Sequence, residues 1–171
     1  MEGLYSFMIN QAQLSARPVL EGLSRGGLFA LNWGIKHPDR TKAIYLDAPV
    51  CDFNSWPGGK GRGEGSSSDW EECLRVYGLT EESVSHFAFM PIDNLNAMAE
   101  ENIPIIVVAG DSDKIVPMEE NTCLLEERYR AMGGRVQVIV KQGVGHHPHG
   151  LDDPSPIIDF IERNAIFEST S

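Results

Sequence analysis

The sequence predicts an α/β protein in which a parallel sheet of about four strands is flanked by helices. Short apolar runs alternate with segments of helical periodicity, which is the pattern of repeated β-α units. The run 103–109 is strongly apolar, as expected for a strand buried on both faces. The chain has 171 residues, 42% of them hydrophobic, so it can bury one sizeable core. We therefore expect a single domain over residues 1–171.

The first half of the chain supplies two of the expected strands. Residues 1–14 are expected to be helical, and residues 18–21 and 42–46 are short apolar runs typical of strands. Between these strands a helix runs through Trp33. It ends before His37, because a residue that precedes proline avoids the helical region.

The second half supplies the other two strands, at 103–109 and 135–141. A helix over 118–132 is expected between them. Gly133 closes it, because glycine readily adopts the left-handed conformation that ends many helices. Pro154 opens a last helix, since proline fits the first helical turn.

A long glycine-rich stretch separates the two halves. It continues into three serines and a polar helix near 69–76. Irregular excursions of this length inside a compact domain are usually functional loops, so we expect a lid or loop insertion at about 52–90. Trp56 within it is a candidate platform for stacking a sugar, and a simple loop anchor is the alternative interpretation.

Ser24 lies between the first expected strand and the first following helix, in the sequence Gly22-Leu23-Ser24-Arg25-Gly26. A serine on a sharp strand-to-helix turn presents its hydroxyl above the sheet, and flanking glycines permit the turn. The Arg25 N–H would then point at a developing oxyanion. A phosphate loop is the alternative, but neither a P-loop lysine nor the G-x-G-x-x-G spacing is present. Ser24 is therefore the candidate nucleophile and Arg25 the candidate oxyanion donor.

Carboxylates follow two of the expected strands. Asp113 comes after the most apolar strand, where it can orient a histidine that arrives from the next loop. Asp111 follows that strand so closely that bracing the turn suits it better, although the two could exchange roles. Asp47 ends the second strand and is the alternate acid. Asp113 is the candidate acid.

Three of the five histidines fall in the loop after the fourth expected strand. Histidine is the side chain suited to accept and return a proton near neutral pH. His146 is the candidate base because it comes first after the glycine turn, with His147 and His149 as alternates. A histidine cluster could also bind a metal, but no cysteine or carboxylate completes a ligand set at a familiar spacing, so no metal is expected.

The candidates occur in the order serine, aspartate, histidine, each on a loop at the C-terminal end of a separate strand. At these residues the chain resembles the α/β-hydrolase superfamily. The resemblance covers nearly the whole chain and is carried by three motifs: Gly22-Leu23-Ser24-Arg25-Gly26, Gly110-x-x-Asp113-x-x-Val116-Pro117 and Gly145-His146. Through residues 45–50 and 145–149 the chain is also similar to uncharacterised bacterial esterase-like proteins associated with carbohydrate breakdown.

The resemblance implies a truncated form of the superfamily's fold, corresponding to its C-terminal half. Its members usually have eight strands with the nucleophile after the fifth, whereas Ser24 follows the first expected strand. The missing strands would carry the loop with the second oxyanion donor, whose loss costs on the order of 10²–10³ in rate. The strand at 18–21 would also expose an edge. We expect either a shortened form of a longer enzyme or a homodimer across this edge.

The expected function is hydrolysis of a carboxylic ester through an acyl-enzyme intermediate, without a cofactor. An acyl group on a carbohydrate is the substrate class that the resemblance implies, but peptidases and lactonases use the same residues. A catalytically weak or inactive truncated fold that serves as an interaction domain is the alternative. Metal-dependent hydrolysis by the histidine cluster is a third possibility.

Charge and composition narrow the partners to a small-molecule or carbohydrate ester. The net charge of −11 disfavours nucleic acid and anionic membrane surfaces. The three cysteines include no C-x-x-C pair and are expected to be reduced thiols. The first residues lack the pattern of a signal peptide, so the default expectation is a cytoplasmic protein, although a longer natural form could be exported.

Overall fold

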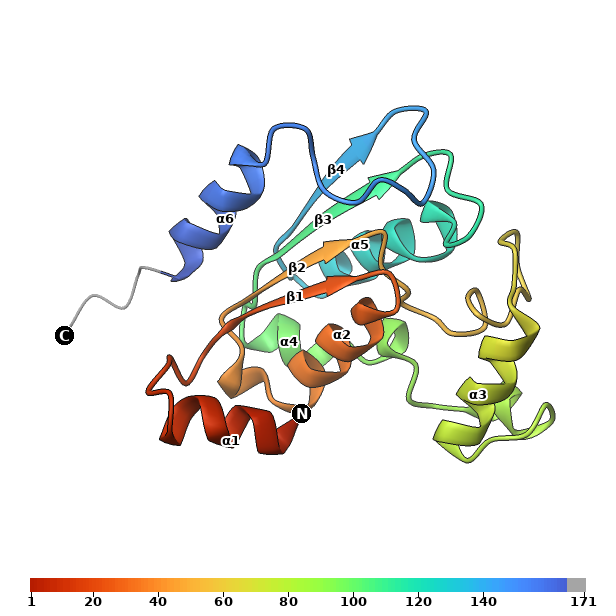
Figure 1. Cartoon of the computed structure of the whole chain (residues 1–171), viewed down its shortest axis with the longest axis horizontal. Helices are drawn as coiled ribbons and strands as arrows, with labels where there is room; N and C mark the ends of the chain where they lie inside the picture. The colour runs from red at the N-terminus through yellow and green to blue at the C-terminus, as the bar shows by residue number, and fades with distance from the viewer. Residues whose placement is uncertain (166–171) are drawn as a thin grey trace.

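Four parallel strands form the sheet at the centre of the structure, a computed structural model that describes residues 1–165. The strands are β1 (Val19–Leu23), β2 (Ala43–Asp47), β3 (Ile105–Gly110) and β4 (Val136–Lys141). Their order in the sheet is β1-β2-β3-β4, and each neighbouring pair is parallel (Figure 1). The predicted α/β fold with a four-stranded parallel sheet is therefore confirmed.

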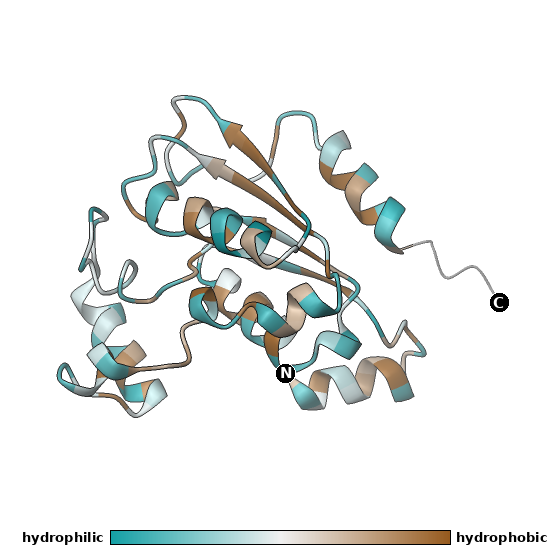
Figure 2. Ribbon diagram, turned by 180° about the vertical axis from the view of Figure 1, so that it is seen from behind, coloured by the Kyte–Doolittle hydropathy of each residue, from teal (hydrophilic) through white to brown (hydrophobic). Residues whose placement is uncertain are grey.

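Helices cover both faces of this sheet. The helices α2 (Gly26–Lys36), α4 (Asn96–Glu100) and α5 (Thr122–Ala131) lie on one face, and α6 (Ser155–Ala165) lies on the other (Figure 1). Every residue of β2 and β3 is buried, because these central strands are covered on both sides. Figure 2, which is coloured by hydropathy, shows that strands of the sheet are rich in apolar residues, drawn in brown.

The edge strand β1 is more exposed than the central strands, since β2 is its only strand neighbour among the described residues. The helix α1 (Glu2–Asn10) precedes it and packs against α2. The rings of Tyr5 and Trp33 lie 5.4 Å apart, and the Tyr5 hydroxyl donates to the Ala16 carbonyl oxygen at 2.8 Å. These contacts fix the approach of the chain to β1.

The glycine-rich excursion after β2 is folded against the rest of the domain. It contains α3 (Ser67–Tyr77) and the 3₁₀ turns η2 (Ser83–His86) and η3 (Pro91–Asp93). The Ser66 side chain accepts a hydrogen bond from the Asp69 amide and so caps α3. Phe53 is fully buried and anchors the segment. Its aromatic neighbours are Trp70, Tyr77 and Phe87.

Two details differ from the sequence prediction. The expected helix over 118–132 is divided into the 3₁₀ turn η4 (Met118–Glu120) and α5, because Asn121 leaves the helical conformation and uses its side chain for other contacts. The short helices α4 and η1 (Pro38–Arg40) were not predicted.

Within residues 1–165, no helix has the length and apolar character needed to cross a membrane.

Candidate active site

The ends of the strands bring the loops of the candidate site together. In the register of the sheet, Leu23 at the end of β1 lies beside Asp47 at the end of β2, and Asp47 lies beside Val108 in β3. Because the strands are parallel, the segments that follow them leave from the same edge of the sheet. Ser24, Asp113 and His146 all come from these segments.

Ser24 lies on the sharp turn between β1 and α2, and its φ angle is +50°. This left-handed conformation is uncommon for a residue with a side chain and is held by three backbone hydrogen bonds, one of them donated by the Gly27 amide to the Ser24 carbonyl oxygen at 2.9 Å. The Ser24 amide donates to the Asp47 carbonyl oxygen at 2.9 Å, and the Val50 amide donates to the Ser24 carbonyl oxygen at 3.0 Å. A Cβ atom at Gly22 would lie only 2.6 Å from the Gly26 carbonyl oxygen, so the close turn requires glycine there.

Asp113 is held in a fixed orientation on the loop after β3. Its Oδ1 accepts hydrogen bonds from the backbone amides of Ile115 and Val116, both at 2.9 Å. Burial by itself raises the pKa of the Asp113 carboxyl, but the hydrogen bonds from His146 and from these amides outweigh it, and the pKa lies below its ordinary value. The group is therefore an ionised hydrogen-bond acceptor at neutral pH.

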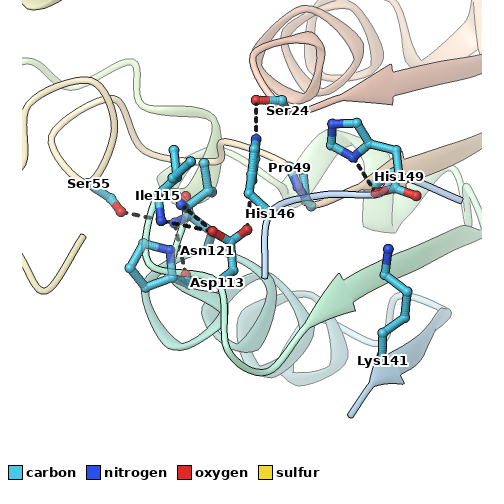
Figure 3. Close-up of polar contacts among 12 residues, drawn as sticks. Ser24, Pro49, Ser55, Asp113, Ile115, Asn121, Lys141, His146 and His149 are labelled. Carbon is cyan, nitrogen blue, oxygen red and sulfur yellow. Dashed lines mark hydrogen bonds and ion pairs between the residues drawn. The ribbon is translucent and has the colours of Figure 1, made fainter. Parts of the chain in front are cut away.

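His146 bridges the other two residues (Figure 3). Its Nδ1 lies 2.7 Å from Asp113 Oδ2, and its Nε2 lies 2.9 Å from Ser24 Oγ. An ionised carboxylate can only accept, so Nδ1 carries the ring proton and Nε2 is left to accept from the serine hydroxyl. The arrangement can withdraw a proton from Ser24 and stabilise the imidazolium that results.

The loop that carries His146 is tied to the end of β3. Asp111 Oδ1 accepts a hydrogen bond from the Gly143 amide at 2.7 Å, so Asp111 braces the turn and does not contact the histidine rings. A Cβ atom at Gly110 would lie 2.1 Å from the Val144 carbonyl oxygen. This close approach of two backbone segments places His146 and requires glycine at residue 110.

The alternate candidates form a second Asp–His pair. His149 Nδ1 lies 2.8 Å from Asp47 Oδ1, and Asp47 Oδ2 accepts from the Gly150 amide at 2.6 Å and from the Tyr45 hydroxyl at 3.0 Å. The ring of His147 is exposed and lies edge to face with the other two. In the described part of the chain, the Ser24 hydroxyl forms a hydrogen bond with neither of these histidines, so the hydrogen bonds join Ser24 to His146 and Asp113.

Arg25 follows the serine directly and is the N-cap residue of α2. Its backbone N–H makes no hydrogen bond within residues 1–165 and lies at the positive end of the helix dipole. Its guanidinium lies 3.3 Å from Asp69 on α3 and 5.9 Å from the ring centre of Trp56. The N–H is therefore available as a hydrogen-bond donor next to Ser24, while the side chain connects the serine turn to the excursion.

A cavity of about 390 Å³ lies between α1, α2 and α3. It is mainly apolar, and its walls include Arg25, Phe29, Trp33, Trp56 and Tyr77. Ser24 does not line it, but the adjacent Arg25 does. Trp56 is thus placed beside the serine turn, on the wall of this cavity.

Asn121 is a site-supporting residue that sequence reasoning missed. It is fully buried. Its Oδ1 accepts from the Cys51 amide at 2.9 Å, and its Nδ2 donates to Ser55 Oγ at 3.0 Å and to the Pro117 carbonyl oxygen at 3.1 Å (Figure 3). These bonds join the start of the excursion to the loop that follows Asp113. The sequence did contain one signal for this role, an asparagine inside an apparently helical segment, because asparagine side chains often form hydrogen bonds that interrupt a helix.

The sheet, the flanking helices and the serine turn together define the class of protein, because they match part of an α/β-hydrolase domain. A model of the prolyl oligopeptidase family matches residues 4–167, and the chain belongs to this family of serine hydrolases. No match is found among curated protein sequences. The narrower resemblance to bacterial esterase-like proteins stays a prediction.

Solved structures support the same fold. A puromycin-hydrolysing peptidase of Mycobacterium tuberculosis is 16% identical with a TM-score of 0.69, over 94% of this chain and 23% of its own. Dipeptidyl peptidase 4 of Porphyromonas gingivalis is 17% identical with a TM-score of 0.70, over 94% of this chain and 21% of its own. An acylaminoacyl peptidase of Pyrococcus horikoshii is 15% identical with a TM-score of 0.68, over 99% of this chain and 27% of its own. The chain thus spans about a quarter of the length of these structures.

Proposed function

We propose that the chain carries the acyl-transfer centre of a serine hydrolase, with Ser24 as nucleophile, His146 as base and Asp113 as acid. The observation that supports this proposal most strongly is the unbroken series of hydrogen bonds from Ser24 Oγ through the His146 ring to Asp113, at 2.9 and 2.7 Å. The strained backbone of Ser24 is a second support, because such strain is typical of a nucleophile turn.

The reaction proceeds in two steps through an acyl-enzyme. Ser24 Oγ attacks the carbonyl carbon of the substrate while His146 Nε2 takes its proton, and Asp113 stabilises the imidazolium. The imidazolium then gives the proton to the leaving group, and water releases the acyl group by the reverse sequence. The Arg25 N–H donates to the oxyanion in both steps. No step requires a cofactor.

The substrate is an acyl compound, either a carboxylic ester, as the sequence suggested, or a peptide. The three structural neighbours described above are named as peptidases, which favours a peptide. Resemblance to esterase-like proteins favours an ester on a carbohydrate. In both cases Trp56 and the cavity beside Arg25 offer an apolar surface for a substrate side chain near the nucleophile.

The competing proposal is an interaction domain with little or no activity. The feature in its favour is the outer edge of β1, which has no strand partner among residues 1–165 and could pair with a second copy of the chain. A clean monomer in size-exclusion chromatography with light scattering would count against that dimer.

The test is intact mass spectrometry after exposure to a fluorophosphonate probe. The wild type should gain one adduct, Ser24→Ala should gain none, and the control Ser67→Ala, an exposed serine on α3, should label like the wild type. A chelator should not change the result. If the folded wild type gains no adduct, the enzyme proposal fails and the interaction domain replaces it.

A further inference from the structure

The loop after β4 gathers three imidazole rings at one place. His146, His147 and His149 each offer one ring nitrogen, and these atoms lie within 4.8 Å of one another. The ring centres are 4.7 to 5.2 Å apart and meet edge to face. We infer that these residues bind a divalent transition metal such as Zn²⁺. We also infer, on the basis of the proposed function, that the bound metal blocks the base of the hydrolase.

Two of the three rings have a carboxylate partner of the kind that metal-binding histidines have. His146 Nδ1 lies 2.7 Å from a carboxylate oxygen of Asp113, and His149 Nδ1 lies 2.8 Å from one of Asp47. Both carboxylates are buried, with side chains 2% and 0% exposed. Each ring therefore donates through Nδ1 and presents the lone pair of Nε2. Metal-binding histidines typically have such a carboxylate partner, which fixes the ring and strengthens the ligand.

The third ring has the freedom to complete the site. His147 is exposed and makes no hydrogen bond among the residues that the structure describes. Zn–N bonds of about 2.0–2.1 Å place the nitrogens of a tetrahedral site about 3.4 Å apart. Separations of up to 4.8 Å must therefore close by as much as about 1.4 Å when the metal binds. Gly145 and Gly150 flank the loop, and Gly150 has a φ angle of +78°. The exposed side chain of His147 can supply part of this movement by rotation about its own torsions.

The charges around the loop favour a cation. The carboxyl groups of Asp113 and Asp47 are hydrogen-bonded to two of the rings, and the chain carries a net charge of −11. The opposing charge is that of Lys141, whose ammonium group donates to the Pro148 carbonyl oxygen. Three imidazoles with water as the fourth ligand form a familiar zinc site.

Metal binding and catalysis compete for one lone pair. His146 Nε2 accepts the hydrogen bond of the Ser24 hydroxyl at 2.9 Å. When a metal takes that lone pair, a nitrogen–metal bond forms, the serine hydroxyl keeps its proton and loses its acceptor, and no group is oxidised or reduced. The metal is therefore an inhibitor. This is the opposite of metal-dependent hydrolysis, which a chelator would stop.

The binding site is tested by calorimetric titration of Zn²⁺ into the metal-free chain. The wild type and the control His86→Ala, which removes an exposed histidine elsewhere, should bind one ion with the same affinity. His147→Ala and His149→Ala should each bind more weakly, by more than the roughly tenfold cost of losing one outer-shell partner. His147 is exposed, so its variant tests the site even if His149→Ala does not fold. Equal affinity in His147→Ala and the wild type would overturn the inference.

The inhibitory role is tested by the rate of fluorophosphonate labelling. At a Zn²⁺ concentration ten times the dissociation constant, labelling of the wild type and of His86→Ala should slow roughly tenfold, and a chelator should restore it. Unchanged labelling with the histidine site occupied would overturn the blocking role. A chain that never labels refutes the proposed function, whereas the titration still decides whether the metal site exists.

Discussion

Replacing Asp113 with asparagine tests the candidate triad most sharply, because the substitution keeps the shape of the side chain and changes only its hydrogen bonding. Oδ1 of Asp113 accepts hydrogen bonds from two backbone amides, both at 2.9 Å, and Oδ2 lies 2.7 Å from His146 Nδ1. The amides of Ile115 and Val116 can only donate, so the single carbonyl oxygen of the asparagine must face them. The NH₂ group of Asn then faces His146.

This orientation inverts the tautomer of the histidine. Facing a donor, Nδ1 must become the acceptor, and the ring proton moves to Nε2, which points at Ser24 Oγ. Nε2 can then no longer take the proton of the serine. In serine proteases with this arrangement, the same change lowers kcat by about 10⁴, and we expect a loss of that size for Asp113→Asn.

The assay is kcat/KM for a p-nitrophenyl ester, measured for Asp113→Asn and for the matched variants Asp111→Asn and Asp47→Asn. Asp111 contacts Gly143 and not the histidines, and asparagine retains an acceptor for that bond, so less than about a tenfold change is expected. The reasoning is refuted if Asp113→Asn stays within tenfold of the wild type, or if Asp47→Asn loses more activity than Asp113→Asn.

Three further predictions follow from the contacts around the site. Gly110→Ala places a Cβ atom 2.1 Å from the Val144 carbonyl oxygen, so the loop that carries the base must shift by about 1 Å and kcat should fall about 100-fold in a folded protein. Asn121→Ala leaves the buried Cys51 amide without its acceptor and should lower the free energy of unfolding by about 2 to 4 kcal/mol in urea titrations. The lowered pKa of Asp113 contributes stability above its unfolded value of about 3.9, and this contribution disappears as pH falls through the folded pKa. The stability difference between wild type and Asp113→Asn should therefore shrink below about pH 4, and an unchanged difference would contradict the assignment.

The strands were predictable from sequence because their signal is local. The run at 103–109 is strongly apolar, as expected for a strand covered on both faces, and β3 is buried at every residue. The course of residues 118–132 was not predictable. Its break at Asn121 depends on contacts with Cys51 and Ser55, about 70 residues earlier in the chain, and helical periodicity carries no information about such partners.

For the site, the sequence predicted which loops meet but left several residues open within them. Parallel strands in sequence order place the segments after β1, β3 and β4 at one edge, so Ser24, Asp113 and a histidine were expected together. Which histidine faces the serine depends on the path of the loop. That path is fixed by the approach of Gly110 to Val144, a contact between backbones that no local pattern records.

The alternation of side chains along β2 explains why Asp47, although close to the serine in the backbone, does not orient His146. The backbone carbonyl oxygen of Asp47 accepts a hydrogen bond from the Ser24 amide at 2.9 Å. The Asp47 side chain, however, lies on the same face of the sheet as Tyr45, two residues earlier, and accepts a hydrogen bond from the Tyr45 hydroxyl. That face is the one packed by α6, where Tyr45 belongs to the core. A carboxylate there meets the chain as it returns from β4 toward α6, at His149 and Gly150. Asp113 lies on a loop beyond β3 and is free of this alternation, so it can reach around to His146. The two Asp–His pairs are thus alternatives in the sequence only. Because of the pleat of β2, the Asp47 side chain contacts His149 and Gly150, and Asp113 is the carboxylate that contacts His146, the partner of Ser24.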